Sequence, residues 1–233
     1  MTKPLIAAAC ATLLVAFAVP AAASAPRQLP TLETISARSG DRPMPRNDGS
    51  RPLAAGTYTA KLFPRPVVMT VPAGWRGGQG QSRELKAPGS DFRWIVLSQG
   101  TAARAQGAIT IETSAKTTPS VAAVVAGLRS RGHGATYGPL SSVTVAGLPA
   151  RQFDGAAGPN GHIFVPFSPP THVAAFFADA LYVDPGEAFR IDVLAVRGKT
   201  VVVFVDSAAL PPERFTAFLA RAEQILGSLR FPH

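Results

Sequence analysis

Cysteine and charged residues are scarce in this sequence. Its 233 residues include one cysteine, Cys10, which excludes both a disulfide framework and a cysteine-ligated zinc site. Charged residues make up only 16% and hydrophobic residues 46%, so the chain as a whole is not intrinsically disordered. Acidic residues are outnumbered, 14 against 23 Lys and Arg, for a formal net charge of +9. This imbalance is typical of a protein that meets anionic lipid or wall polymer, or of ordinary solubility.

The common catalytic and nucleotide-binding motifs are also absent. The sequence has no G-x-S-x-G elbow, no S-x-x-K, no H-E-x-x-H and no G-x-x-x-x-G-K. A glycine-rich stretch, Gly74–Gly80, follows a predicted strand, but no predicted helix follows it, so we do not interpret it as a nucleotide-binding loop. We therefore expect no catalytic residue, no metal and no cofactor.

The first 25 residues have the pattern of a secretory signal peptide. Lys3 precedes an uncharged run of 15 residues, Leu5–Val19, and small residues follow. The run is shorter than the roughly 18 residues that span a bilayer comfortably. We expect an exported protein of the cell envelope, with cleavage after Ala23 or Ala25. The alternative is an uncleaved membrane anchor.

Residues 26–55 are rich in proline and arginine and show no apolar periodicity. Such a segment buries too little apolar surface to offset its ordering entropy, so we expect a disordered tether. Residues 56–233 then form a single domain. Alternating apolar patterns predict strands in this domain at 57–62, 67–71, 83–87, 92–98, 108–112, 142–145, 149–153, 181–183, 188–196 and 199–206.

The last two predicted strands form a hairpin. The two-residue turn Arg197-Gly198 fixes its register and places Ile191 opposite Phe204. The face that carries these two residues is apolar, whereas the other face also carries Arg190 and Asp192. The preceding strand, 181–183, is expected to pair with 188–191 across the turn at 184–187.

Two helices are predicted. The first has Thr118 as its N-cap and ends near Gly132. The second begins at Pro211-Pro212 and has apolar residues at intervals of three and four up to Leu229. We expect the second helix to cover the apolar face of the hairpin. The fold class is α+β, an antiparallel sheet flanked by helices.

Two features are candidates for ligand binding. Arg190 and Asp192 are two apart on one strand, so they share a face and form either a polar spot in a pocket or a solvated ion pair; we favour the ion pair. The stretch 163–182 is unusually apolar and contains Phe164 and Phe167, so it is either core or a contact surface. A cavity between these two features would suit a small ligand.

A catalytic alternative involves Asp154, His162 and His172. These residues would form an acid–base pair or a metal site if the fold brought them together, and we favour unrelated loop residues. The leading hypothesis is a non-enzymatic domain that binds an envelope protein, a lipid or a wall polymer. We expect no nucleic-acid partner and a monomer. The alternative is a secreted hydrolase with its site at these three residues.

Several stretches resemble a group of uncharacterised secreted proteins of high-GC Gram-positive bacteria. They are residues 55–59, 63–75, 145–149, 190–203 and 229–231. More distantly, a strand that ends in Pro-x-Gly-Trp75, a C-terminal hairpin and a closing helix are similar to PsbP-like domains. The resemblance implies an α/β/α sandwich and a non-enzymatic accessory or binding role. No residue of this sequence matches a metal or cofactor position of PsbP-like domains, so the resemblance implies neither.

Overall fold

A nine-stranded antiparallel sheet forms the centre of the described structure, a computed structural model that covers residues 28–35, 50–81, 92–100, 105–115, 119–130, 134–167, 181–208 and 210–232. The predicted signal peptide and the predicted strand 83–87 lie outside these ranges. The strand order is β1 (Arg51–Pro52), β4 (Trp75–Gln81), β5 (Phe92–Gly100), β6 (Ala105–Ser114), β13 (Lys199–Asp206), β12 (Ala188–Val196), β9 (Leu148–Ala157) and β7 (Ala135–Tyr137), and β8 (Ser141–Val145) also pairs with β9.

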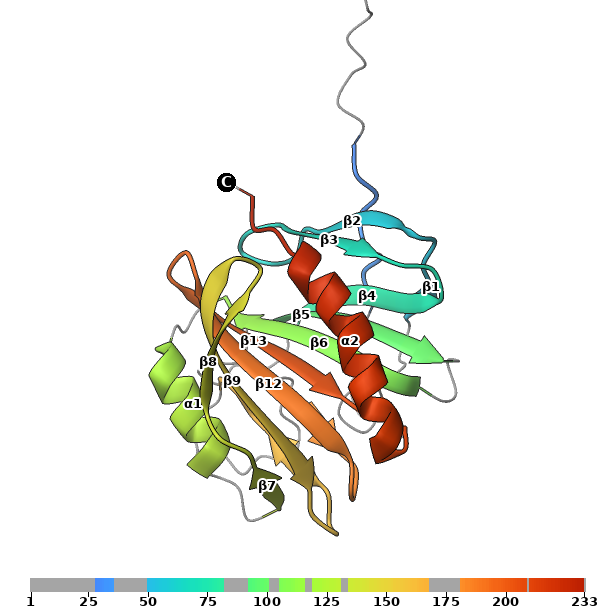
Figure 1. Ribbon diagram of the computed structural model, residues 1–233. Helices are drawn as coiled ribbons and strands as arrows, with labels where there is room; N and C mark the ends of the chain where they lie inside the picture. The colour runs from blue at the N-terminus through green and yellow to red at the C-terminus, as the bar shows by residue number, and fades with distance from the viewer. Residues whose placement is uncertain are drawn as a thin grey trace, which may run out of the picture.

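Each face of the sheet is covered by one helix and one small two-stranded sheet (Figure 1). On one face lie α2 (Pro212–Ser228) and the hairpin of β2 (Gly56–Ala60) and β3 (Val67–Val71). On the other face lie α1 (Val121–Ser130) and the pair formed by β10 (His162–Phe164) and β11 (Leu181–Val183). The predicted α+β class, an antiparallel sheet flanked by helices, is confirmed. In the described ranges, neither helix is long and apolar enough to cross a membrane.

The C-terminal hairpin has the predicted register, but α2 covers the face opposite to the predicted one. Ile191 pairs with Phe204, and the turn residues Arg197 and Gly198 have φ of 48° and 79°. The helix packs on the face that carries Leu194 and three valines of β13, Val201, Val203 and Val205. These side chains make that face apolar enough to bury a helix, because Arg190 and Asp192 both lie between the start and the middle of β12 and the β13 residues opposite them are valines.

The expected pairing of 181–183 with 188–191 is wrong. β11 pairs with β10 in the small sheet, with Ile163 opposite Tyr182. The turn itself forms, since the Glu187 N–H donates to the Asp184 carbonyl at 3.1 Å, but it leads the chain from the small sheet into β12. β12 instead pairs with β9 on one side and β13 on the other, so it has no free edge.

Residues 75–80 of the glycine-rich stretch belong to a strand, β4, and Gly74 lies in the turn before it with φ of 85°. The glycines of β4 allow a close approach of neighbouring side chains. A Cβ added at Gly80 would lie closer than 3.0 Å to the indole of Trp94, which lies opposite on β5 and is 1% exposed. The stretch therefore serves packing, and the strand prediction missed it because glycine is a poor strand former elsewhere.

Parts of the predicted tether are packed against the domain. The Leu32 N–H donates to the Thr59 carbonyl at 2.9 Å, and Gln79 Nε2 donates to the Leu32 carbonyl at 2.7 Å. Leu32 is buried, and Leu53 donates its N–H to the carbonyl of Trp75. The prediction of disorder is therefore corrected for residues 28–35 and 50–55, where added strand pairing stabilises a segment with few apolar residues.

Both helix starts were predicted closely. α1 begins at Val121, and Ser120 rather than Thr118 caps it, because Ser120 Oγ accepts from the Ala123 N–H at 3.2 Å. Thr118 and Gly132 lie outside the described residues. α2 begins at Pro212, as expected for a proline in the first helical turn.

Candidate functional site

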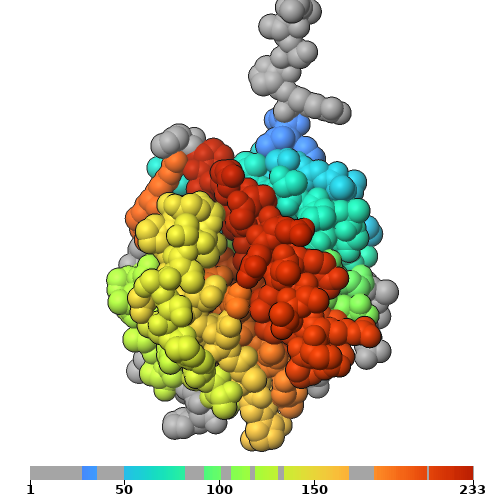
Figure 2. Space-filling view, in the orientation of Figure 1, coloured from blue at the N-terminus to red at the C-terminus, as the bar shows by residue number. Residues whose placement is uncertain are grey.

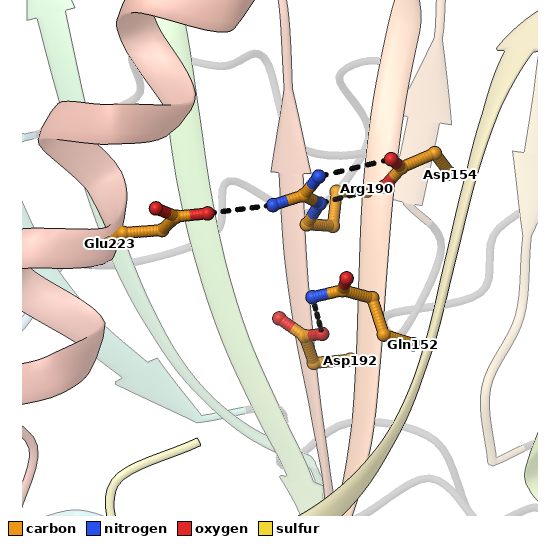
Figure 3. Close-up of polar contacts among 5 residues, drawn as sticks. All are labelled: Gln152, Asp154, Arg190, Asp192 and Glu223. Atoms are coloured by element: carbon orange, nitrogen blue, oxygen red, sulfur yellow. Dashed lines mark hydrogen bonds and ion pairs between the residues drawn. The ribbon is translucent and has the colours of Figure 1, made fainter. Parts of the chain in front are cut away.

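The candidate site lies on the face of the sheet that α2 covers. Arg190 and Asp192 both point to this face from β12, and the register places them opposite Asp154 and Gln152 of β9. Glu223 of α2 approaches from above the sheet (Figure 3). Five polar side chains from three elements therefore meet in one region of an otherwise apolar interface.

Arg190 is engaged by two carboxylates. Its Nε and Nη2 donate to Asp154 at 2.7 and 3.0 Å, and its Nη1 donates to Glu223 Oε1 at 2.8 Å. The hydrogen bonds with Asp154, followed by the charges of the nearby carboxylates, raise the pKa of Arg190 above its usual range against the opposing effect of burial. The predicted partner Asp192 receives none of these hydrogen bonds, so the expected ion pair of Arg190 with Asp192 is replaced by pairs with Asp154 and Glu223.

Asp192 is a buried carboxyl that is satisfied on one side. It is 1% exposed, and its Oδ1 accepts a hydrogen bond from Gln152 Nε2 at 2.7 Å. Its Oδ2 is buried and has no hydrogen-bond partner among the described residues. Figure 3 shows this oxygen turned away from Gln152, toward the side on which α2 lies.

Burial raises the pKa of Asp192 to about 6. Desolvation is the main cause, and the carboxylates of Asp154 and Glu223 act in the same direction. The Gln152 hydrogen bond and the charge of Arg190 oppose the rise without cancelling it. Asp192 therefore changes its charge close to neutral pH, which is unusual for an aspartate.

Four of the five polar residues, all except Asp154, line a pocket of about 370 Å³ between α2, the β8–β9 hairpin and the sheet. In Figure 2 the hairpin and α2 lie on either side of a shallow furrow on this face. Most lining side chains are apolar, and Asp192, Gln152, Arg190 and Glu223 supply most of the polar groups. The apolar lining residues are Val143, Val145, Ala146, Val205, Leu219, Ala222 and Leu226. A concave apolar surface with a few convergent polar groups is typical of small-molecule sites.

Phe164 and Phe167, the other predicted binding residues, lie on the opposite face of the sheet. They are 1% and 6% exposed and belong to the core beneath α1. The Phe164 ring lies 4.9 Å from that of Phe189 and 5.8 Å from that of Phe204. Phe164 and Phe167 therefore do not share a cavity with Arg190 and Asp192, because the sheet separates them.

The three residues of the catalytic alternative are not brought together. Asp154 pairs with Arg190 on the α2 face, whereas His162 packs against Phe164 on the α1 face and lies 3.5 Å from the hydroxyl of Tyr137. Burial lowers the pKa of His162. His172 lies outside the described residues. Within the described ranges, no group of three or more His, Cys, Asp or Glu side chains is placed to hold a metal.

Three parts of the site were missed by sequence reasoning. Gln152 carried no signal, since an isolated glutamine in a strand is common. Glu223 carried no signal, since a glutamate on the polar face of an amphipathic helix is common; its side chain is 60% exposed, but it reaches Arg190. Val143 and Val145 were predicted only as part of the short strand 142–145. The pairing of β9 with β12 places Gln152 beside Asp192, the pairing of β8 with β9 adds Val143, and the packing of α2 adds Glu223. The assembly of these elements is not a local property of the sequence.

The chain is similar in structure to several proteins of low sequence identity. One is the cyanobacterial PsbP (CyanoP) of Synechocystis, at 12% identity and a TM-score of 0.44 over 77% of this chain and 94% of that chain. Another is a protein of Bacteroides thetaiotaomicron, at 8% identity and a TM-score of 0.35 over 72% and 45%. A third is LpqN of Mycobacterium tuberculosis, which is involved in cell envelope biogenesis, at 13% identity and a TM-score of 0.31 over 71% and 83%.

No protein-family model and no curated protein matches the chain. All three TM-scores are low, so the fold assignment rests on the topology of this chain alone: an antiparallel α+β sandwich with a pocket beneath its C-terminal helix. The resemblance to secreted proteins of high-GC Gram-positive bacteria stays a prediction.

Proposed function

We propose that this protein is an exported, non-enzymatic binding module of the bacterial cell envelope that takes a small, largely apolar ligand beneath α2. One observation carries the proposal: a pocket of about 370 Å³ is open between α2 and the sheet, lined by apolar side chains and by the buried carboxyl of Asp192. A concave and mostly apolar surface that includes a buried polar side chain is typical of a ligand site.

The chemistry of the lining favours binding over catalysis. Arg190 is held by Asp154 and Glu223, and Asp192 lines the space with a carboxyl whose Oδ2 is buried without a donor among the described residues. The remaining surface is mostly aliphatic. Such a lining excludes water from an apolar body and orients it through one polar contact. Among the envelope components named above, a lipid or a small lipid-like molecule fits this surface better than a wall polymer.

Location at the envelope is supported by the sequence of the first 25 residues, with its basic start and uncharged run. The test is production of the full chain in a bacterium, followed by intact-mass measurement of the protein outside the cytoplasm. We expect loss of residues 1–23 or 1–25. Full-length protein retained in the cytoplasm would contradict export.

Ligand binding is tested on the same exported protein by native mass spectrometry. We expect a fraction of the protein to carry a bound small molecule. Gly227 lines the pocket, and a Cβ added there meets nothing within 4 Å, so Gly227→Phe is expected to fill the pocket and release the molecule. Gly127→Phe is the matched control, because Gly127 of α1 also has open space and lies away from the pocket. If both variants retained the bound molecule equally, the assignment of the pocket as its binding site would be overturned.

A further inference from the structure

The polar end of the pocket specifies which ligand chemistry it takes. We propose that the pocket binds an organic cation, an ammonium group on an apolar body, with an N–H of the cation donating to Asp192 Oδ2. This inference rests on the proposed function, because it assigns the polar contact of the same site. The apolar body would contact Leu219, Leu226 and Val143.

The first argument is the hydrogen-bond inventory of Asp192. The side chain is 1% exposed, Oδ1 is used by Gln152, and Oδ2 is buried without a donor among the described residues. A carboxylate only accepts hydrogen bonds, so the group that completes it must be a donor. A buried acceptor without a partner is costly, and a bound donor removes that cost.

The second argument is the charge around the pocket. Asp192, Asp154 and Glu223 are three carboxylates, and in the part of the chain that the structure describes Arg190 is the guanidinium that pairs with Asp154 and Glu223. Arg190 gives all three of its described hydrogen bonds to Asp154 and Glu223. The field at Asp192 Oδ2 is therefore that of an excess of negative charge in a largely apolar surrounding, where a cation is bound more strongly than a neutral donor.

The third argument is the pocket's shape relative to these charges. The carboxyl lies on the sheet, and the aliphatic side chains of α2 and β8 line the opposite sides. A ligand with a charged head and an apolar body matches both parts at once. An anionic ligand is disfavoured because its head would meet unpaired carboxylate oxygen, and a purely apolar ligand would leave Oδ2 without a donor.

The experiment compares phenethylammonium with 2-phenylethanol, which share one apolar body and differ in the charge of the head. Each is titrated into the full chain, and binding is followed by amide chemical shifts. We expect phenethylammonium to bind roughly tenfold more tightly than 2-phenylethanol at pH 7.5, as for a charge-assisted against a neutral hydrogen bond. We also expect its affinity to be roughly tenfold weaker at pH 5, because Asp192 is then mostly protonated.

Variants test whether Asp192 is the source of the preference for phenethylammonium over 2-phenylethanol. Asp192→Asn is expected to weaken the affinity for phenethylammonium by about tenfold, whereas the affinity for 2-phenylethanol should change by less than about threefold. Glu213→Gln removes an exposed carboxylate in the first turn of α2 and is expected to change the affinity for neither compound. The amide spectrum of each variant reports that the fold is retained.

The outcomes separate the two proposals. Equal affinities for the two compounds, or an ammonium preference that survives Asp192→Asn, would overturn the cation assignment. If 2-phenylethanol still bound and Gly227→Phe abolished it, the pocket would remain a binding site for neutral apolar molecules. If neither compound bound, the cation assignment would be refuted, and the native-mass experiment would decide the binding function separately.

Discussion

Nη1 of Arg190 on β12 lies 2.8 Å from Oε1 of Glu223 on α2, and this ion pair joins the central sheet to the helix above the pocket. The two partners differ in environment: the Arg190 side chain is 17% exposed and that of Glu223 is 60% exposed. Arg190 also holds Asp154 through two parallel hydrogen bonds. Arg190 is therefore the residue through which β9, β12 and α2 are connected at the polar end of the pocket.

The two ion pairs of Arg190 should differ in strength. Double-mutant cycles with Arg190→Met are expected to give a coupling of about 0.5 kcal/mol with Glu223→Gln and about 1 kcal/mol with Asp154→Asn, because the latter pair is bidentate. Urea denaturation of the single and double variants measures both energies. A larger coupling to Glu223 than to Asp154 would contradict the geometry.

Asp192 should make the protein less stable as the pH rises. Its pKa is about 6 in the folded protein against 3.8 as the usual value, so between these values the folded state binds more protons than the unfolded state. The free energy of unfolding therefore falls as the pH rises from about 4 to 7, by roughly 2 to 3 kcal/mol from this group. Urea denaturation at several pH values measures the slope.

Asp192→Asn removes the titrating group and should flatten this part of the profile. At pH 7 the variant should equal or exceed the stability of the original protein, since an uncompensated buried charge is gone. Glu213→Gln serves as the control and should retain the slope. A variant at Asp192 that keeps the full slope would show that another group is responsible.

Gly107 should be intolerant of any side chain. Its φ is 92°, and an added Cβ would lie closer than 3.0 Å to the ring of Phe218, the fully buried residue of α2 that also contacts Trp75. Gly107→Ala is expected to lower the free energy of unfolding by roughly 2 to 4 kcal/mol, from backbone strain and overpacking. Urea denaturation measures the loss.

The matched substitution Gly127→Ala should act in the other direction. Gly127 lies within α1 with open space around it, and alanine is the better helix former, so a gain of roughly 0.5 to 1 kcal/mol is expected. If both alanine variants shifted stability equally, the close contact between β6 and α2 would be wrong.

His162 should titrate below its usual pKa of 6.5, because burial against Phe164 disfavours the imidazolium. The unfolded state then binds protons more readily, so this residue stabilises the fold above pH 6.5 and its contribution is lost as the pH falls. Titration of the His162 ring resonances by NMR measures the pKa. A value at or above 6.5 would contradict the buried placement.

Local signals predicted the last hairpin well and its surroundings poorly. The turn Arg197-Gly198 fixes the register of Ile191 against Phe204 within a few residues, so the sequence is sufficient there. The face that α2 covers depends instead on the balance between two largely apolar faces, one of which also carries Arg190 and Asp192. Glu223 and Asp154 neutralise Arg190 on that face, and both come from other parts of the chain, so the hairpin sequence alone does not show that α2 can cover it.

The candidate site, too, could be predicted only in part from local sequence patterns. Arg190 and Asp192 were found because residues two apart on a strand share a face. Phe164 and Phe167 were grouped with them because apolar residues in a predicted loop suggest a contact surface, whereas the pairing of β10 with β11 makes them core. The pocket needs β8, β9, β12 and α2 together, and only the long-range pairing of these elements creates it.

The most direct test of the account is where a bound ligand lies. Isotope-filtered NOE spectra of the full chain with 2-phenylethanol or phenethylammonium report which methyl groups touch the ligand. We predict NOEs to Leu219, Leu226 and Val143, and none to Val124 and Leu128 of α1, which belong to the core on the opposite face. NOEs confined to the α1 side, or to neither group, would contradict a binding site beneath α2.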